Sequence, residues 1–194
     1  AMQAAKLIRD RHWRRGLATQ SALRPWLQEA GSLTARLKRH YADFAVQPVE
    51  EGWRTANVDE LALLGQRAGQ WAWVRDVWLQ GAGEGQVFAH SVMCRTVLRG
   101  RWHGLRHIGR RPLGAALFAD TRVRRGRLHF KRIGRAHPLF RRILASMPEL
   151  TASQLWARRS VFTLEQSAIL VTEVFLPGII PASTHIPLFV QDRP

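Results

Sequence analysis

The clearest hydrophobic pattern in the chain lies near its C-terminus, at residues 168–177. β-Branched and aromatic residues fill this stretch up to its final proline, which predicts a β-strand with two apolar faces. Because side chains alternate across a strand, Glu173 shares a face with Ile169, Val171 and Phe175. A carboxylate among apolar neighbours costs free energy unless a cation or a polar ligand compensates it. Glu173 therefore needs a partner elsewhere in the chain or in a ligand.

Short stretches rich in β-branched and aromatic residues, bounded by turn residues, predict further strands. The expected strands are residues 51–56, 71–79, 86–93, 122–132, 156–164 and 168–176. The loops at 81–85 and 165–167 are short, so each joins its two neighbours as an antiparallel hairpin. The glycines of loop 81–85 do not predict a phosphate-binding loop, because a strand and not a helix follows them.

Helical spacing of apolar residues and capping residues predict helices between and before these strands. Ser32 is expected to cap one helix, and Pro112 to be the first residue of another. The expected helical segments are residues 21–31, 33–40, 58–65, 98–109, 113–118 and 134–153. Hairpins with helices grouped at the start and in the middle indicate an α+β fold on an antiparallel sheet.

Length and composition favour a single domain for residues 1–194. We expect a basic arm at 1–20, a helical insertion at 134–153 and an irregular tail at 178–194. The chain has no run of eighteen uncharged apolar residues, which a membrane span would require. Residues 1–15 carry charges in place of a signal-peptide apolar region. The single cysteine, Cys94, excludes an internal disulfide and agrees with a reducing compartment. A cytoplasmic protein with Cys94 buried as a small hydrophobe is therefore expected.

The charge balance is strongly basic, with thirty Lys and Arg against fourteen Asp and Glu and a formal net charge of +16. Such a charge favours an anionic partner. Nearly all of it is arginine, however, and the arginine pairs are scattered along the chain, whereas a nucleic-acid-binding stripe would concentrate them. We therefore do not expect nucleic-acid binding, although a basic nucleic-acid-binding protein stays among the alternatives.

A partner for Glu173 is predicted on the strand at 71–79. Alternation there places Arg75 on the face of Trp71, Trp73 and Val77, so it too is a charge among apolar side chains. Two arrangements are equally compatible with the pattern: a direct buried salt bridge between Arg75 and Glu173, or a ligand held between them. A third arrangement, with Arg75 on a solvent face, is disfavoured because it exposes too much aromatic surface.

Two predicted helix starts strengthen the ligand alternative. Leu33 and Leu113 each begin a helix, where free backbone N–H groups favour an anion. Together with Arg75, which can donate two hydrogen bonds to one carboxylate, they would bind a small carboxylic acid, with Glu173 at its hydroxylated end. A weaker pattern is the pair His103 and His107, which lacks the rest of a zinc-helix motif and is expected at the surface.

Six motifs in order, spanning about residues 21–177, resemble chorismate lyase. They are Ser32-Leu33-Thr34-Ala35-Arg36, Glu51-Gly52-Trp53, Trp73-Val74-Arg75-Asp76-Val77, Pro112-Leu113-Gly114 with Leu117-Phe118, Leu155-Trp156-Ala157-Arg158-Arg159-Ser160 and 170–177. The resemblance implies an antiparallel sheet of about six strands whose helices form flaps over an internal cavity. It implies removal of the enolpyruvyl group of chorismate to give pyruvate and 4-hydroxybenzoate, the committed step toward ubiquinone, without metal or organic cofactor. We expect the protein to be a monomer.

The resemblance also assigns roles to the four residues selected above. It implies that Arg75 and the backbone at Leu33 and Leu113 hold the ring carboxylate, and that Glu173 meets the 4-oxygen end. His90 stands where the family can have an arginine, which puts a second carboxylate clamp at that position in doubt. The main alternative is a ligand-sensing domain of the same fold, attached to bacterial transcription regulators, which binds a small acid without converting it.

Overall fold

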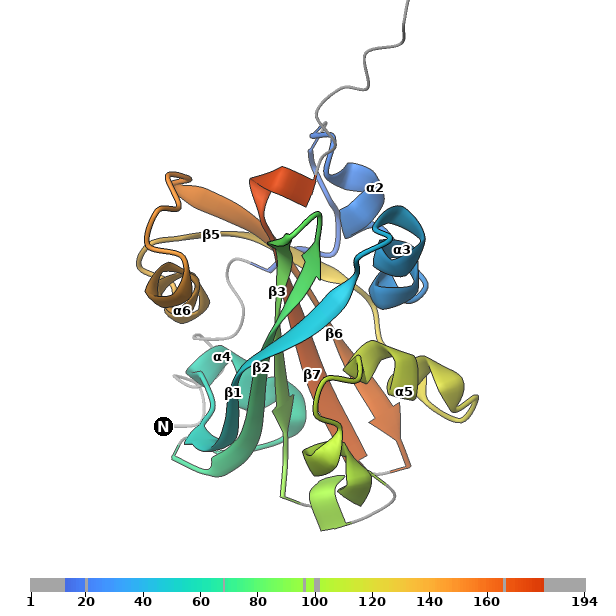
Figure 1. Cartoon of the computed structure of the whole chain (residues 1–194). Coiled ribbons are helices and arrows are strands. Elements are labelled where there is room, and N and C mark those ends of the chain that lie inside the picture. Colours follow the sequence, from blue (N-terminus) through green and yellow to red (C-terminus); the bar gives the residue numbers. More distant parts are fainter. Residues whose placement is uncertain are drawn as a thin grey trace, which may run out of the picture.

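A seven-stranded antiparallel sheet forms the centre of the computed structural model (Figure 1). The strand order is β1-β2-β3-β7-β6-β4, and β5 pairs with another part of β6. The strands are β1 Ala45–Thr55, β2 Trp71–Gly81, β3 Glu84–Met93, β4 Arg124–Arg125, β5 His129–Gly134, β6 Gln154–Leu164 and β7 Ser167–Phe175. The structure describes residues 13–19, 21–67, 69–95, 97–99, 102–165 and 167–179.

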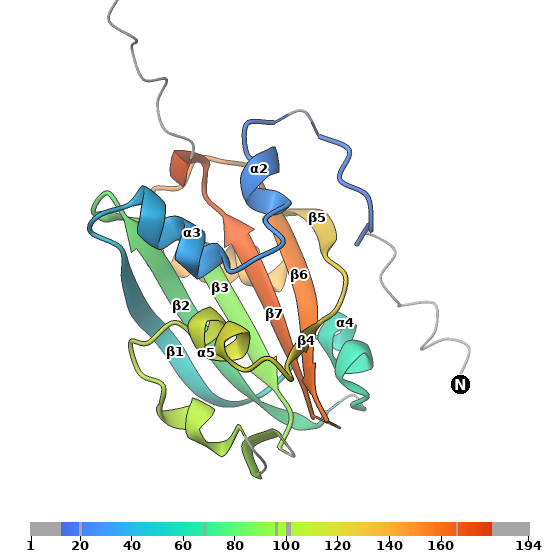
Figure 2. The same ribbon diagram turned by 90° about the vertical axis from the view of Figure 1, so that its right-hand side faces the viewer.

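Short helices cover both faces of this sheet. Figure 2 shows α2, α3 and α5 over one face, which we call the front face, and Figure 1 shows α4 and α6 on the opposite side. The α-helices are α2 Arg24–Leu27, α3 Leu33–His40, α4 Val58–Leu61, α5 Leu113–Ala119 and α6 Pro138–Ser146. Four 3₁₀-helices are also described: η1 Ala62–Leu64, η2 Val97–Arg99, η3 His103–His107 and η4 Pro177–Ile179.

Apolar side chains on both faces of the strands hold the helices in place. On the front face Leu27 and Leu37, both fully buried, pack in one cluster with Phe175 of β7. On the back face Phe140 of α6 packs in another cluster with Phe88 of β3. The central strands are therefore apolar on both faces, as their sequences predict.

The predicted α+β fold and both predicted hairpins are confirmed. Ser32 caps α3 as expected, because its Oγ accepts a hydrogen bond of 3.2 Å from the Ala35 N–H. The first strand begins earlier than predicted, at Ala45, and the basic segment 122–132 is divided into two strands, β4 and β5.

Three helix predictions were wrong in detail. Residues 98–109 do not form one amphipathic α-helix but contribute to η2 and η3, although their apolar residues are buried as the spacing required. The helix predicted for 21–31 is shorter than expected, because its N-cap residue is Leu23 and it ends at Leu27. Pro112 has an extended conformation and precedes α5 as its N-cap residue instead of being its first residue.

The predicted segments of the single domain are described in part. The segment 134–153 contains α6. Within the arm 1–20, residues 13–19 are described, and Arg14 forms a β-bridge with Phe130. Most of the tail 178–194 lies outside the described residues. The division into arm, insertion and tail stays a prediction.

Candidate active site

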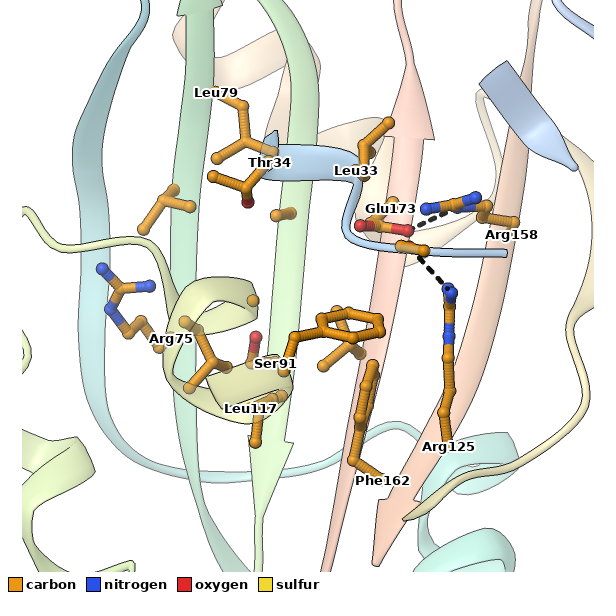
Figure 3. Close-up of a pocket in the computed structure, with 17 residues that line it drawn as sticks. Leu33, Thr34, Arg75, Leu79, Ser91, Leu117, Arg125, Arg158, Phe162 and Glu173 are labelled. Atoms are coloured by element: carbon orange, nitrogen blue, oxygen red, sulfur yellow. Dashed lines mark hydrogen bonds and ion pairs between the residues drawn. The ribbon is translucent and has the colours of Figure 1, made fainter. Parts of the chain in front are cut away.

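A cavity of about 40 Å³ lies between the front helices and the sheet (Figure 3). Helices α3 and α5 contribute its cover, and β2, β3, β6 and β7 its floor. All four residues that the sequence selected line this one cavity: Leu33, Arg75, Leu113 and Glu173. Its apolar walls include Val77, Leu117 and Phe162.

Arg75 marks one end of the cavity. Its side chain is only 2% exposed, so the solvent-facing alternative was wrong. Nη2 donates a hydrogen bond of 2.6 Å to the Gly109 carbonyl, and Nε lies 3.9 Å from Glu51 Oε1. Burial lowers the pKa of Arg75, although Glu51 opposes that effect; an arginine starts so basic that it keeps its charge. Arg75 Nε is buried without a hydrogen-bond partner among the described residues.

The starts of α3 and α5 meet above the cavity. Leu33 and Leu113 are the first residues of the two helices, and both are buried. A Cβ atom on Gly114 would lie 3.2 Å from Thr34 Oγ1, so the glycine allows the two helices to approach closely. The first N–H groups of a helix have no partner within it, so both helix starts bring free donors to this wall of the cavity.

Glu173 lies at the other end of the cavity, where its ion-pair partner is Arg158. These residues are directly opposite each other on β7 and β6, and Arg158 Nε lies 2.5 Å from Glu173 Oε2. Figure 3 shows Arg75 on one side of the cavity and Glu173, Arg158 and Arg125 on the other. A direct salt bridge between Arg75 and Glu173 is therefore wrong. The cation that compensates Glu173 comes from the neighbouring strand.

Arg158 and Arg125 also tie the loop between α2 and α3 to the sheet. Arg158 Nη1 donates to three carbonyls of residues 26, 27 and 29, at 2.9 to 3.1 Å. Arg125 Nη1 donates to the Ala30 and Gly31 carbonyls at 3.0 and 3.2 Å, and its Nε donates to Ser160 Oγ at 2.9 Å. The two arginines therefore fix the chain immediately before Leu33.

The sequence pattern alone assigned no role to Arg158 or Arg125. Alternation along the strand at 156–164 places Arg158 on the same face as Trp156 and Phe162, so the test that singled out Glu173 would also have found it. Arg125 gave no comparable signal. It lies in a segment with many arginines, and only the pairing of β4 with β6 brings it to the cavity.

His90 does not face the cavity. Its neighbours Ala89 and Ser91 line the cavity, whereas the His90 ring lies on the back face, with Nδ1 2.5 Å from Asp76 Oδ1 and Nε2 3.0 Å from Glu60 Oε1. Burial lowers the pKa of His90, but the two carboxylates outweigh it and raise the pKa to about 10. His90 is thus part of a charge network behind the sheet and contributes no carboxylate clamp.

Two other sequence predictions concern side chains outside the cavity. His103 and His107 are exposed on η3, where a period of three residues puts positions four apart on different faces. Cys94 is buried, and its burial raises the pKa of the thiol.

Within the described ranges, no three His, Cys, Asp or Glu side chains could together hold a metal ion. No helix in those ranges is long and apolar enough to cross a membrane.

The fold resembles solved structures of regulator domains. The chain aligns with the effector domain of PhnF from Mycobacterium smegmatis at a TM-score of 0.55 and 15% identity, covering 76% of this chain and 89% of that domain. It also aligns with the ligand-binding domain of a putative GntR-family transcriptional regulator from Bordetella bronchiseptica at a TM-score of 0.51 and 15% identity, covering 70% and 86%. At this identity the likeness shows the fold alone.

Sequence comparisons identify the family. The chain is 47% identical to a probable chorismate pyruvate-lyase from Thiobacillus denitrificans, over 81% of this chain and 84% of the relative. It is 43% identical to a probable chorismate pyruvate-lyase from Methylobacillus flagellatus, over 89% and 96%. Residues 10–184 match the profile of the chorismate lyase family, and the chain therefore belongs to that family.

Proposed function

We propose that this protein is a chorismate lyase, which releases pyruvate from chorismate and leaves 4-hydroxybenzoate for ubiquinone biosynthesis. The observation that carries the proposal is one cavity that has Arg75 at one end and Glu173 at the other. A substrate with a carboxylate at one end of a ring and oxygen substituents at the other matches this distribution of charge. The family to which the chain belongs supports the same activity.

In the proposed complex, Arg75 and the N–H groups at Leu33 and Leu113 hold the ring carboxylate. The Arg75 Nε atom, buried without a partner in the described part of the chain, supplies one free donor for it. The Arg75 guanidinium is held by the Gly109 carbonyl before substrate arrives, so this donor needs little reorganisation on binding. The ring then lies against Val77 and Leu117, and its substituted edge faces Glu173.

The reaction breaks the bond between ring carbon C3 and the ether oxygen, and it removes the hydrogen on C4 as a proton. The electron pair of the C4–H bond enters the ring, which becomes aromatic, and the enolpyruvyl oxygen departs with the pair of the C3–O bond. Protonation of the released enol converts it to pyruvate. Aromatisation provides the driving force, so positioning and electrostatics suffice without a metal or an organic cofactor. In this proposal Glu173 acts near the ether oxygen, where it either donates a proton or only orients the ring.

The cavity must widen to admit such a substrate. A volume of about 40 Å³ accommodates a few water molecules, which is less than a substituted ring requires. Leu33 and Leu113 cover the cavity from α3 and α5, so we propose that these helices shift outward as flaps when substrate enters.

The decisive experiment is incubation of the purified protein with chorismate while 4-hydroxybenzoate is followed by absorbance. We expect product from the wild type, a raised KM in Arg75→Ala and a lowered kcat in Glu173→Gln. Normal substrate affinity in Arg75→Ala would rule out the carboxylate clamp. Near-normal turnover in Glu173→Gln would rule out proton donation by that residue.

A second candidate function follows from the solved structures of similar fold. One of them is the ligand-binding domain of a putative GntR-family transcriptional regulator, and another is the effector domain of PhnF. We therefore also consider a domain that binds a small acid without converting it. Tight binding of 4-hydroxybenzoate with no product from chorismate would favour this sensor over the lyase. The four sequence-selected residues would then bind the acid without a reaction.

We also propose that the protein is cytoplasmic and monomeric and that it does not bind nucleic acid. Size-exclusion chromatography with light scattering tests the monomer, and fractionation of cells tests the location. Retention on nucleic acid that falls steeply with salt would contradict the last proposal.

A further inference from the structure

The Glu173 end of the cavity carries more positive charge than its carboxylate balances. Arg125 and Arg158 both line this end, and Glu173 is the acidic residue in the described lining. The nearby Glu29 is already paired with Arg36 at 3.1 Å on the outer side of the loop. Two guanidinium groups therefore share one cavity carboxylate, and a second anion would complete the charge balance.

Arg158 also has an unused hydrogen-bond donor. Its side chain is 0% exposed, and Nη2 is buried with no partner among the residues that the structure describes. The same guanidinium uses Nε for Glu173 and Nη1 for the carbonyls before α3. An unsatisfied buried donor on a charged group is costly, and a site that normally holds an acceptor there removes the cost.

We propose that Arg125 and Arg158 bind the second carboxylate of the substrate, the one on the enolpyruvyl group. This inference rests on the proposed function, because it concerns the same cavity. With the ring carboxylate on Arg75 and the C4 oxygen near Glu173, the ether at the adjacent carbon C3 directs the side chain toward the Glu173 end. A planar guanidinium suits a carboxylate, since it can donate two parallel hydrogen bonds.

The electrostatics of this end agree with a bound anion. Burial lowers the pKa of Arg125, and the nearby charge of Arg158 lowers it further, while Glu173 and Glu29 raise it. A carboxylate between the two arginines would relieve their mutual repulsion.

The arrangement explains how substrate can be distinguished from product. Chorismate carries two carboxylates, whereas 4-hydroxybenzoate keeps only the ring carboxylate and the other leaves with pyruvate. Arg75 serves both molecules, so its contribution to affinity is similar for each. Arg125 and Arg158 serve the substrate, and the contact is lost when the C3–O bond breaks.

The test uses two stable aromatic acids of matched shape. One is 3-(carboxymethoxy)benzoate, which carries both carboxylates, and the other is 3-(carbamoylmethoxy)benzoate, whose side chain is a neutral amide. Calorimetric titration of the wild type is expected to show a preference for the diacid of about tenfold or more. Arg125→Gln and Arg158→Gln are each expected to reduce this preference to about twofold or less, because the diacid loses more affinity than the amide does.

Arg124→Gln is the matched control, because Arg124 is an exposed neighbour on β4 outside the cavity lining. It should keep the wild-type preference. Equal binding of the two acids by the wild type would overturn the inference. So would an equal loss of both affinities in Arg125→Gln, since that result assigns the arginine only to holding the loop before α3. Arg125→Gln and the wild-type titration decide the matter even if Arg158→Gln fails to fold.

These results are independent of turnover. If chorismate is not converted but the diacid preference and its dependence on Arg125 hold, the lyase proposal fails and the dicarboxylate site stands. If chorismate is converted and Arg125→Gln changes neither the preference nor the KM, the lyase stands and the second clamp fails.

Discussion

Replacement of His90 by glutamine is expected to destabilise the protein in a way that depends on pH. The ring is 1% exposed and lies on the back face between Asp76 and Glu60. The second oxygen of Asp76 accepts a hydrogen bond of 2.6 Å from Arg142 of α6. Glutamine keeps hydrogen-bonding groups but not the charge, so it leaves Glu60 buried without the cation that it faces.

The magnitude follows from the proton affinity of the imidazole. Each factor of ten in that affinity is about 1.4 kcal/mol. Glu60 and Asp76 raise the pKa of His90 from 6.5 to about 10 against the opposing effect of burial, which stabilises the fold by an amount on the order of 5 kcal/mol. Burial alone would raise the pKa of Glu60, but His90, together with hydrogen bonds from Asn57, lowers it to about 2. That is the same interaction seen from its partner, and it is counted once. Removal of one partner from a buried pair typically costs about 3–5 kcal/mol.

The sign of the pH dependence is fixed by the direction of the shift. A group whose pKa is raised on folding stabilises fully below its unfolded pKa and loses that contribution as pH rises toward the folded value. In the wild type the free energy of unfolding should therefore fall between pH 6.5 and 10 by up to the amount above. In His90→Gln that decline should be absent, so the difference between the two proteins should shrink as pH rises.

Urea unfolding followed by tryptophan fluorescence, at intervals between pH 6 and 9.5, measures this difference. Comparison of variant with wild type removes the titration of groups common to both, such as Cys94 and the lysines. His107→Gln is the matched control, because His107 is exposed and should leave the pH dependence unchanged. A constant difference between His90→Gln and the wild type across this range would refute a charged His90 in the folded protein.

Three further predictions concern single contacts. Ser32→Ala removes the cap of α3 and should cost about 1 kcal/mol, measured as a lower Tm, and it should weaken binding of 4-hydroxybenzoate because Leu33 begins that helix. Gly81→Ala would press a Cβ into the Tyr41 ring, and urea unfolding should show a loss of about 1–3 kcal/mol in the free energy of unfolding. Gly83→Asn is the control and should lose much less, because Gly83 lies in a turn at φ +76° that is open to solvent. Cys94 should react with a thiol reagent only as the protein unfolds, because burial raises the pKa of its thiol; rapid labelling of the native protein contradicts this.

The sequence predicted the parts of the fold that depend on local pattern. Strands β2, β3, β6 and β7 follow from alternation and short loops, and the residues that they carry to the cavity follow from the same alternation. Arg75 and Glu173 were found because each is a charge on an apolar face. The α3 start was found because Ser32 has the side chain that a helix N-terminus requires.

What the sequence did not predict depends on contacts between distant segments. The ion pair of Glu173 needs the register of β6 against β7, which pairs Arg158 with Glu173, and register is a property of two strands together. Segment 98–109 has helical spacing, but burial of its apolar residues did not need a continuous α-helix, and two 3₁₀ pieces achieve it. Arg125 reaches the cavity because β4 pairs with a part of β6 that β5 does not cover.

The buried arginines also change the meaning of the net charge. Arg75, Arg158 and Arg159 are among the largest fully buried side chains described, so part of the +16 lies inside the protein. Charge held inside a cavity selects a small anion that can enter it, and it contributes little to a surface that a polyanion could contact. A sensor domain of this fold needs only enough cation to hold its ligand. The proposed lyase needs in addition a carboxylate beside the bond that breaks, and we propose that Glu173, which lies beside Arg158 in the cavity, has that role.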